Sequence, residues 1–560
     1  MTGFYDQRPW LKYYSPWVPP DIEIPNENMV QVFKRAVSRQ SSRPAIYYFG
    51  SPLSYAEVDW WSDRLAAALQ EMGLQKGDRV VFYMQNIPQF VIAQYAVWKA
   101  GGIVVPLNPM YKEKELEYFF QDSGAKILIS LASSYEITAK SVVDRLNLGP
   151  VITTSGIDFL PPDEPLSKVL QEEKSRKYSE TFDFVDLLKK YEGKKPQPVE
   201  ISQQEAAYLT YTSGTTGPPK GALNTHENIV FNAMFYTIAL QLSQPDVILG
   251  VAPLFHVTGQ VAHLASATYA GIPVILFFRF DPDEAFKLIE RWKATMTLGS
   301  ITVFISWMNH PDMKKYDFST MKKVYTGGAP VPMAVVEKFE EISGTYIHNA
   351  YGLTETNSPS HFTPWGTRAP VDEETGALSI GIPICNTISK IMDLETGERE
   401  LPPGEIGEIV VKGPMVIPGY WNKPHETAHA IRNGWLYTGD VGKMDEKGWF
   451  YVIDRKKDLI IVSGYKVWPR EVEDVLYQHP AVKEATVIGI PDPYRGETVK
   501  AFVALKEPSK DKVSSEELIE FCRKRMAAYK CPRMVEITPE IPKTFTGKFL
   551  RRALREKEKP

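Results

Sequence analysis

Residues 206–221 of the chain read AAYLTYTSGTTGPPKG. The segment AAYLTY predicts a buried strand, and a helical pattern begins further on, at about His226. Between them, small hydroxyl residues and glycines allow backbone N–H groups and Oγ atoms to converge on an anion, and Lys220 adds a positive charge. The stretch therefore predicts a phosphate-binding loop within an α/β fold.

This loop differs from the P-loop of common nucleotide triphosphatases, whose pattern is GxxxxGK[ST]. Pro219 stands before Lys220 where that pattern has Gly, and Gly221 follows where it has the Ser or Thr that holds magnesium. A flexible Gly/Ser/Thr linker is the other interpretation, and the exact series of residues disfavours it.

On the N-terminal side, helix and strand patterns alternate from residue 61 to residue 131. Pro88 opens one helical segment and Gly101 follows its end, the usual asymmetry of helix termini. Apolar strand patterns alternating with helices indicate parallel β-α units. The predicted helices are 61–73, 88–99 and 112–124, and the predicted strands are 78–84, 103–107 and 125–130.

Composition excludes several classes of protein. The 560 residues, at about 150 per domain, predict three to four domains or subdomains. A formal net charge of -4 excludes a strongly basic nucleic-acid binder and a long acidic disordered chain. Three cysteines exclude a disulfide scaffold, and their spacing disfavours a thiolate metal site. The N-terminus lacks the apolar run of a secretory signal, so we expect a cytoplasmic protein.

Two segments have unusual charge. Residues 247–278 contain no Asp, Glu, Lys or Arg, but Pro253, Gly259 and Gly271 interrupt them, so a buried wall of a pocket or core is favoured over a membrane span. Residues 501–560 hold 15 Lys and Arg against 9 Asp and Glu. Either a small basic domain shares an anionic ligand with a larger domain, or, as charge alone favours, these residues form a solvated face.

Several separated motifs, in order, make the chain resemble the adenylate-forming enzymes, and most of all the fatty-acid–CoA ligases. Besides the loop they are APLFH (252–256), TGGAP (326–330), YGLTET (351–356), GEIVVKGPMVIPGYW (407–421), YTGD (437–440), DRKKDLIIVSGYKVWPREVE (454–473) and PKTFTGKFLR (542–551).

The resemblance implies an α/β fold in two parts. Residues 1–456 would form a large AMP- and acyl-binding domain of β-α-β subdomains with parallel sheets and a small barrel-like subdomain. Residues 457–560 would form a mobile α+β domain that rotates about a hinge at Lys457.

The resemblance also assigns site residues. Thr212 and Glu355 would lie beside Mg²⁺, Tyr351 would stack on adenine, and Asp440 would accept from both ribose hydroxyls. His256 would be a gate near the substrate carboxylate. Without the family, Tyr351 is equally a buried aromatic and Glu355 more often a surface charge. The full ATP- and AMP-binding set is Thr212, Ser213, Gly214, Thr215, Thr216, Gly217, Lys220, Gly328, Ala329, Pro330, Tyr351, Gly352, Thr354, Asp440 and Arg455.

Further residues come from the predicted mobile domain. Lys548 matches the family's catalytic lysine, with His256 and Glu355 as the other catalytic residues, although a single lysine is usually a surface residue. The loop of Gly464, Tyr465 and Lys466 would replace Lys548 beside the thiol tunnel after rotation. The other interpretation of Gly464 is a turn glycine. Gln260, in a region that is often bulky in long-chain enzymes, leaves the shape of the acyl tunnel open.

The predicted function is an ATP- and CoA-dependent ligase for an apolar carboxylic acid, expected to be a medium- to long-chain fatty acid. The alternatives are an aryl-acid or small hydroxy-acid CoA ligase and an acyl-AMP ligase that acts without CoA. The resemblance implies Mg²⁺ as cofactor. No nucleic-acid partner and no membrane span are expected. Peripheral membrane contact and a homodimer are both open, and the aromatic arm of residues 4–17 could dock on its own chain or on a partner.

Overall fold

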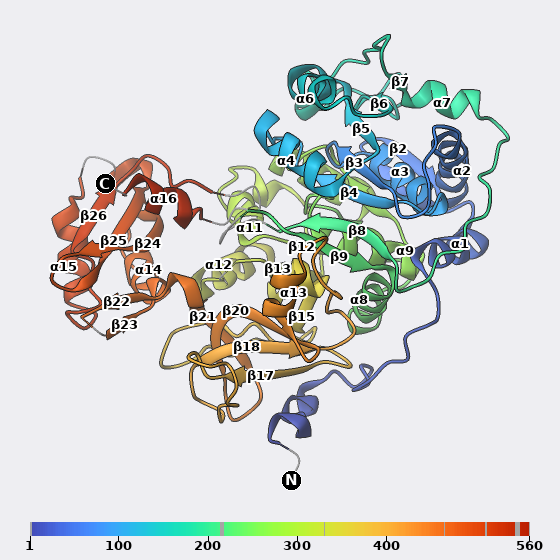
Figure 1. The fold of residues 1–560 in the computed structure, drawn as a ribbon. Helices are drawn as coiled ribbons and strands as arrows, with labels where there is room; N and C mark the ends of the chain where they lie inside the picture. The colour runs from blue at the N-terminus through green and yellow to red at the C-terminus, as the bar shows by residue number, and fades with distance from the viewer. Residues whose placement is uncertain are drawn as a thin grey trace.

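The computed structural model describes residues 3–212, 218–329, 331–463, 465–509, 512–543 and 549–558, with the backbone alone at Lys457, Lys466 and Pro508. Four sheets organise these residues. Three belong to a large N-terminal part, and the fourth forms a small part beside it (Figure 1). The mixed α/β fold predicted from the sequence is confirmed, with parallel sheets in the large part.

The seven-stranded sheet has the order β7-β6-β5-β3-β4-β8-β9. Its strands are parallel except for the hairpin of β8 and β9. The predicted strands are present, and β9 was missed: the chain returns from the phosphate loop as an antiparallel strand before helix α8 begins at His226. Its strands are β3 (Arg79–Tyr83), β4 (Ile103–Leu107), β5 (Ile127–Leu131), β6 (Val151–Thr154), β7 (Phe182–Asp183), β8 (Ala206–Tyr211) and β9 (Gly221–Thr225).

The helices around this sheet follow the sequence signals closely. Helix α2 starts earlier than predicted because Ser54 and Glu57 form a capping box. Helix α4 ends where Gly124 adopts a φ of 58°. The helices are α1 (Met29–Gln40), α2 (Tyr55–Glu71), α3 (Pro88–Lys99), α4 (Glu113–Ser123), α5 (Ala132–Ser134), α6 (Lys140–Leu146), α7 (Phe184–Lys190) and α8 (His226–Ala239).

The nine-stranded sheet has the order β16-β15-β14-β13-β12-β10-β11-β1-β2, with a parallel centre and antiparallel edges. Its strands are β1 (Pro44–Tyr48), β2 (Ser51–Ser54), β10 (Ile248–Leu249), β11 (Val274–Leu276), β12 (Met296–Gly299), β13 (Lys323–Gly327), β14 (His348–Leu353), β15 (Ser358–Phe362) and β16 (Ile382–Pro383). Helices α9 (Ser266–Ala270), α10 (Pro282–Trp292), α11 (Ile301–Met308) and α12 (Met333–Ser343) lie between these strands in the sequence.

The charge-free span 247–278 is core. It contributes β10, the π-helical segment η5 (Thr258–Ala265), α9 and β11, and Ala265 and Ala267 are buried. Among the described residues, no helix combines the length and the apolar character needed to cross a membrane.

The subdomain expected to be barrel-like is a five-stranded antiparallel sheet. Its strands are β17 (Ile388–Met392), β18 (Gly407–Lys412), β19 (Ile431–Arg432), β20 (Trp435–Met444) and β21 (Phe450–Arg455), with α13 (Pro424–Ala430) before β19. The N-terminal arm docks on this part of its own chain: Tyr5 and Trp10 are buried, and the Tyr5 hydroxyl donates to the carbonyl of Leu401 at 2.8 Å.

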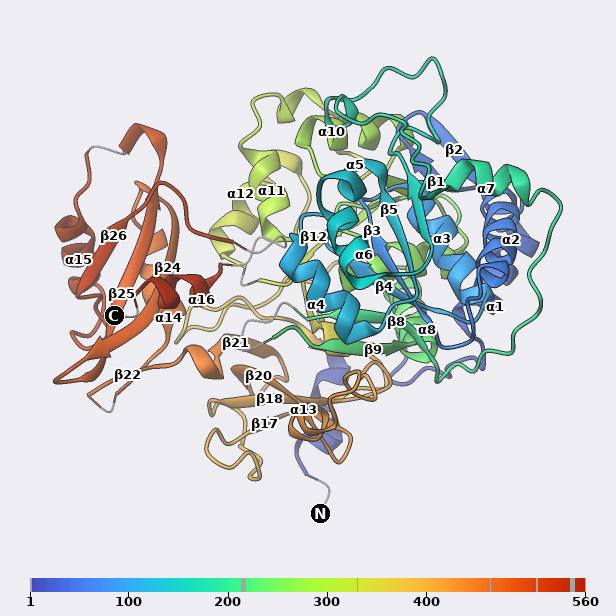
Figure 2. The ribbon, with the colours of Figure 1, turned by 45° about the horizontal axis from the view of Figure 1, so that its top comes forward.

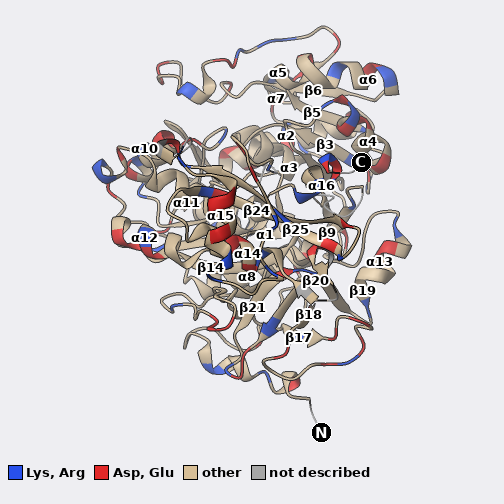
Figure 3. Ribbon diagram, turned by 90° about the vertical axis from the view of Figure 1, so that its left-hand side faces the viewer, with Lys and Arg blue, Asp and Glu red and all other residues tan. Residues whose placement is uncertain are grey.

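The small part has its own sheet, in the order β23-β22-β25-β24 with β26 against β25, and its own buried core. Figure 2 again shows the small part beside the large part, with α16 on the side of the small part that faces the viewer. Basic and acidic residues share helices such as α10 and α12 (Figure 3). The elements of the small part are β22 (Ile460–Val462), β23 (Tyr465–Val467), β24 (Val482–Asp492), β25 (Gly496–Leu505), β26 (Met534–Ile537), α14 (Pro469–Tyr477), α15 (Ser515–Arg523) and α16 (Arg551–Lys557).

Four buried histidines make the large part sensitive to acid. Burial lowers the pKa of His226 and His361 to about 3 and that of His263 and His348 to about 4, against 6.5 for an ordinary histidine. As pH falls below 6.5, these histidines bind protons in the unfolded chain but stay neutral in the folded chain. The free energy of unfolding therefore decreases. Each histidine should account for a loss of about 2 kcal/mol between pH 6.5 and pH 5.

We predict that His263→Gln reduces the fall of the thermal midpoint between pH 7 and pH 5, because one of the four buried histidines is gone. His425→Gln, at an exposed position on α13, is the matched control and should keep the wild-type fall. A wild-type fall in His263→Gln would contradict the assignment of a neutral, buried imidazole.

Candidate active site

One cavity of about 960 Å³ gathers residues from the three sheets of the large part and from the small part. Nine of the residues predicted from the sequence line it together, although they are up to 243 positions apart in the chain. They are Thr212, Lys220, His256, Gly328, Tyr351, Gly352, Thr354, Glu355 and Arg455.

The loop that the sequence predicts to bind phosphate connects β8 to β9. At its base the backbone N–H of Thr212 donates to the carbonyl of Lys220 at 2.9 Å, and the N–H of Lys220 donates to the Thr212 hydroxyl at 3.3 Å. Both ends of the loop therefore face one cavity. Ser213, Gly214, Thr215, Thr216 and Gly217 lie outside the described residues.

Lys220 and Glu355 face each other across a tyrosine. The Lys220 ammonium lies over the ring of Tyr420, 4.5 Å from its centroid, and the Tyr420 hydroxyl donates to Glu355 Oε1 at 2.7 Å. Burial, with the Glu355 charge, raises the pKa of Tyr420, so this hydroxyl stays a donor. The arrangement sets a cation and a carboxylate in one cavity without a direct ion pair among the contacts described, which leaves both available to a charged ligand.

Asp440 is not itself among the residues that line the cavity, but two donors that line it, Tyr351 and Arg455, hold its carboxylate. Tyr351 on β14 donates its hydroxyl to Oδ2 at 2.6 Å, and Arg455 on β21 places Nε 3.0 Å from Oδ1. Burial and the charge of Asp440 raise the pKa of Tyr351, so the phenol remains protonated. A carboxylate has about four acceptor positions, and two donors leave room for the paired hydroxyls of a ribose.

Glycines permit close approach around Tyr351. A Cβ on Gly352 would lie 1.6 Å from the carbonyl oxygen of Ser358, so this position excludes any side chain. Gly328 has a φ of 79°, which L-residues rarely adopt. Gly328 lines the cavity; Ala329, its neighbour, is described but is not among the lining residues, and Pro330 lies outside the described residues.

A further set of lining residues is apolar or weakly polar. His256 precedes η5, and its Nδ1 accepts from the backbone N–H of Thr258 at 3.3 Å. In the charge-free span only Phe255, His256, Val257 and Thr258 line the cavity. They are accompanied by Leu107, Tyr236, Leu298, Ala350, Leu353 and Pro359.

The small part reaches the cavity through Lys543 and Leu550, which stand on either side of residues 544–548 in the sequence. Lys548 and Gly464 lie outside the described residues, and only the backbone is described at Lys457 and Lys466. Tyr465 is 60% exposed, with its ring centroid 4.9 Å from that of Tyr529, and it does not line the cavity. The side of the small part that carries Lys543, rather than Tyr465, faces the cavity.

Sequence reasoning missed several lining residues. Tyr420 stands inside the motif GEIVVKGPMVIPGYW, which supported the family resemblance, but no role in the site was predicted for this tyrosine. Glu408 and Lys456 also line the cavity and pair at 3.0 Å. The separation of 48 residues gave no signal for this contact.

Two family models match the chain. Residues 33–421 match the AMP-binding enzyme family, and residues 471–548 match the AMP-binding enzyme C-terminal domain. The chain belongs to the AMP-binding enzyme family.

Relatives within this family match along nearly the whole chain. The long-chain-fatty-acid–CoA ligase of Bacillus subtilis is 40% identical, covering 99% of this chain and 98% of its own length. The anthranilate CoA ligase AuaEII in complex with anthranoyl-AMP has a TM-score of 0.83 and 25% identity, covering 96% of this chain and 98% of its own. ATP-bound MatB from Rhodopseudomonas palustris has a TM-score of 0.82 and 28% identity, with 95% and 99% covered.

For this AMP-binding enzyme we predict that Asp440→Asn weakens AMP binding about 10- to 100-fold, because charge-assisted hydrogen bonds contribute about 1.5–3 kcal/mol. Calorimetric titration with AMP would measure the change, and the thermal midpoint would confirm folding. Glu446→Gln, at an exposed position in the turn between β20 and β21, is the control. Wild-type affinity in Asp440→Asn would rule out Asp440 as the ribose acceptor.

Proposed function

We propose that the protein is an ATP-dependent acyl-CoA ligase for an apolar carboxylic acid, a medium- to long-chain fatty acid. The observation that carries the proposal is the single cavity in which Lys220, Glu355 and Arg455 share space with apolar side chains such as Val257 and Leu298. Such a lining suits a polyanion together with an apolar acid. The full-length similarity to the Bacillus subtilis long-chain-fatty-acid–CoA ligase supports the same activity.

The reaction would take two steps. A carboxylate oxygen of the acid attacks the α-phosphorus of ATP, the bond to the β-phosphate oxygen breaks, and pyrophosphate leaves. The CoA sulfur then attacks the acyl carbon, the carbon–oxygen bond to AMP breaks, and the thiol proton is released. The products are acyl-CoA, AMP and pyrophosphate.

The first step brings a carboxylate against a polyanion, so preorganised cations must lower the repulsion. Lys220 would serve the β- and γ-phosphates, and Arg455, fixed by Asp440, the ribose or phosphate edge. Lys548 would contact the carboxylate and the α-phosphate. His256 would form the gate beside the acid.

Mg²⁺ fits the donor set of this site. Glu355 offers a carboxylate and Thr212 a hydroxyl, and Mg²⁺ typically binds one or two carboxylates together with substrate phosphates and water. When bound, the ion supplies positive charge that offsets the charge of the phosphates. In this chain, the Tyr420 hydroxyl orients the Glu355 carboxylate.

We propose a domain division at residues 1–456 and 457–560, with Lys457 as the hinge. The separate sheet and core of residues 460–522 support this division, and η8 (Lys456–Asp458) provides the link. Rotation would withdraw the side that carries Lys543 and bring in Gly464, Tyr465 and Lys466 for the thiol step. Cytoplasmic location, a homodimer and peripheral membrane contact stay predictions.

A panel of acids of increasing chain length tests the function. Each buried methylene contributes about 0.8 kcal/mol, so kcat/KM should rise about fourfold per CH₂ until the cavity is full. Acid-dependent exchange of pyrophosphate into ATP without CoA would report the first step, and thioester formation the second.

Three outcomes would overturn this proposal in different ways. Preference for benzoate or a phenylpropenoate over every alkanoate would make the protein an aryl-acid ligase, the class to which the anthranilate CoA ligase belongs. Preference for a short hydroxy acid would make it a hydroxy-acid ligase. Release of pyrophosphate without any thioester would make it an acyl-AMP ligase.

A further inference from the structure

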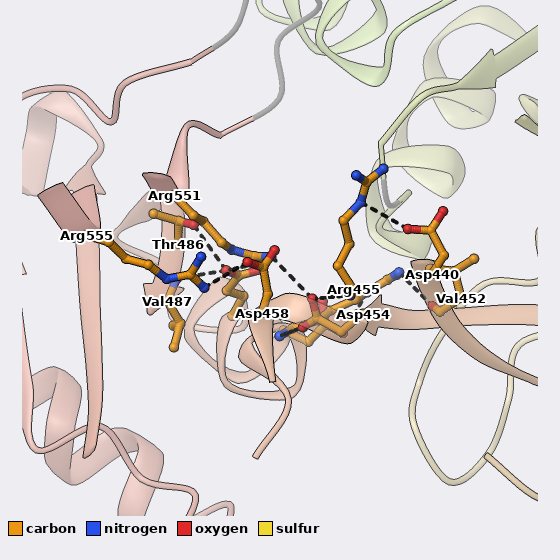
Figure 4. A network of polar contacts seen from close by, with 12 residues as sticks. Asp440, Val452, Asp454, Arg455, Asp458, Thr486, Val487, Arg551 and Arg555 are labelled. Atoms are coloured by element: carbon orange, nitrogen blue, oxygen red, sulfur yellow. Dashed lines mark hydrogen bonds and ion pairs between the residues drawn. The ribbon is translucent and has the colours of Figure 1, made fainter. Parts of the chain in front are cut away.

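Arg551, the first residue of α16, binds three carboxylates at once (Figure 4). Its Nη1 lies 3.3 Å from Asp454 Oδ1 and 3.1 Å from Asp458 Oδ2, and its Nη2 lies 2.7 Å from Glu473 Oε1. A planar guanidinium can serve several acceptors in this way, whereas the ammonium of a lysine is a single point charge.

These three carboxylates stand on opposite sides of the proposed hinge. Asp454 belongs to β21 and precedes Lys457, whereas Asp458 and Glu473 follow it. Glu473 is fixed within the small part, because it accepts from the Thr486 hydroxyl and from the backbone N–H of Val487 on β24. One guanidinium therefore ties the end of the large domain to the small domain.

The residue that Arg551 contacts on β21, Asp454, directly precedes Arg455, which lines the cavity. Successive residues of a strand point to opposite faces, so Arg455 reaches Asp440 while Asp454 reaches Arg551 (Figure 4). The same strand end thus holds the predicted ribose acceptor on one side and the small domain on the other.

The side chains of this ionic contact are largely buried, so the loss of one partner is costly. The side chains of Asp454, Asp458 and Arg551 are 3%, 7% and 18% exposed. Removing one partner of a buried ion pair strongly destabilises the arrangement that contains it. Asp454 also accepts from the backbone N–H groups of Arg455 and Arg470, at 2.7 and 3.0 Å. Arg470 is in α14 of the small part, so on rotation only the Arg455 N–H would stay with Asp454.

We propose that Arg551 is a positioning residue that latches the small domain onto β21 in the orientation in which Lys543 and Leu550 line the cavity. This inference rests on the proposed two-step function and on the hinge at Lys457. Rotation about Lys457 moves Asp458, Glu473 and Arg551 together, so these contacts persist. The contact between Arg551 and Asp454 crosses the hinge and has to break before the thiol step. The hydrogen bonds from Arg470 of α14 to Asp454 and to the carbonyl of Val452 have to break together with it.

Asp454→Asn is the sharpest variant, because it removes the cross-hinge charge and keeps an oxygen that accepts from the backbone. Arg551→Met removes the whole latch, and Arg551→Lys keeps the charge without the forked geometry. Arg552→Met is the matched control: Arg552 is the next residue, 56% exposed, and pairs with Glu556 within α16.

Each half-reaction is measured separately, with pyrophosphate exchange for adenylate formation and thioester formation from supplied acyl-adenylate. We expect Asp454→Asn and Arg551→Met to slow adenylate formation about tenfold or more while thioester formation changes less than about threefold. Arg551→Lys should fall between them and the wild type, and Arg552→Met should match the wild type. Equal losses in both steps, or no loss in either, would overturn the proposal.

A second measurement does not depend on activity. Trypsin can cut the hinge after Arg455, Lys456 or Lys457, and the cleavage rate follows the population of the open hinge when reclosing is fast. We expect Asp454→Asn to be cut here about tenfold faster than the wild type and Arg552→Met. An unchanged rate would overturn the latch. If the wild type makes no acyl-adenylate while Asp454→Asn is still cut faster than the wild type, the proposed function is contradicted and the latch is not.

Discussion

The buried carboxylate of Asp440 joins the parts on which the site depends. It receives the hydroxyl of Tyr351 from the nine-stranded sheet and the guanidinium of Arg455 from its own antiparallel sheet. At 3% exposure a carboxylate needs such hydrogen-bond donors, because an unpartnered buried polar group is costly. Both donors stand on strands, β14 and β21, and both line the cavity, so Asp440 fixes two lining side chains from behind. The proposed hinge begins two residues after Arg455, so the proposed nucleotide site and the proposed mobile domain share one strand end.

This shared strand end connects binding with motion. Lys220, Glu355 and Arg455 come from the large part, which suits groups that would hold a nucleotide through both proposed steps. Lys543 and Leu550 come from the small domain, which suits groups needed in one step only. In the proposed latch, Arg551 holds the small domain, with Lys543 and Leu550, against the large domain. The chemistry of the site thereby depends on a contact that touches no substrate.

Much of the fold was predictable from local signals. The helix 88–99 begins at Pro88 and α4 ends at Gly124, because backbone preferences at these residues are intrinsic. The motifs brought Thr212, Tyr351 and Glu355 to one cavity, as expected. The return strand β9 was missed because GALNT is too short for a clear period. The contacts of Glu408 with Lys456 and of Arg551 with Asp454 join residues far apart in sequence, which no local pattern encodes.

The central claim is that one cavity serves two reactions because the small domain turns about Lys457, and Lys457→Pro tests it most directly. Lys457 lies in a 3₁₀ turn, whose φ of about -60° a proline can adopt. A proline there also restricts Lys456 before it, so rotation about this position should be hindered. Stopped-flow measurement of each half-reaction, with Lys457→Ala as control, should show adenylate formation within about tenfold of wild type and thioester formation reduced about 100-fold or more. Wild-type rates for both steps in Lys457→Pro would contradict the account.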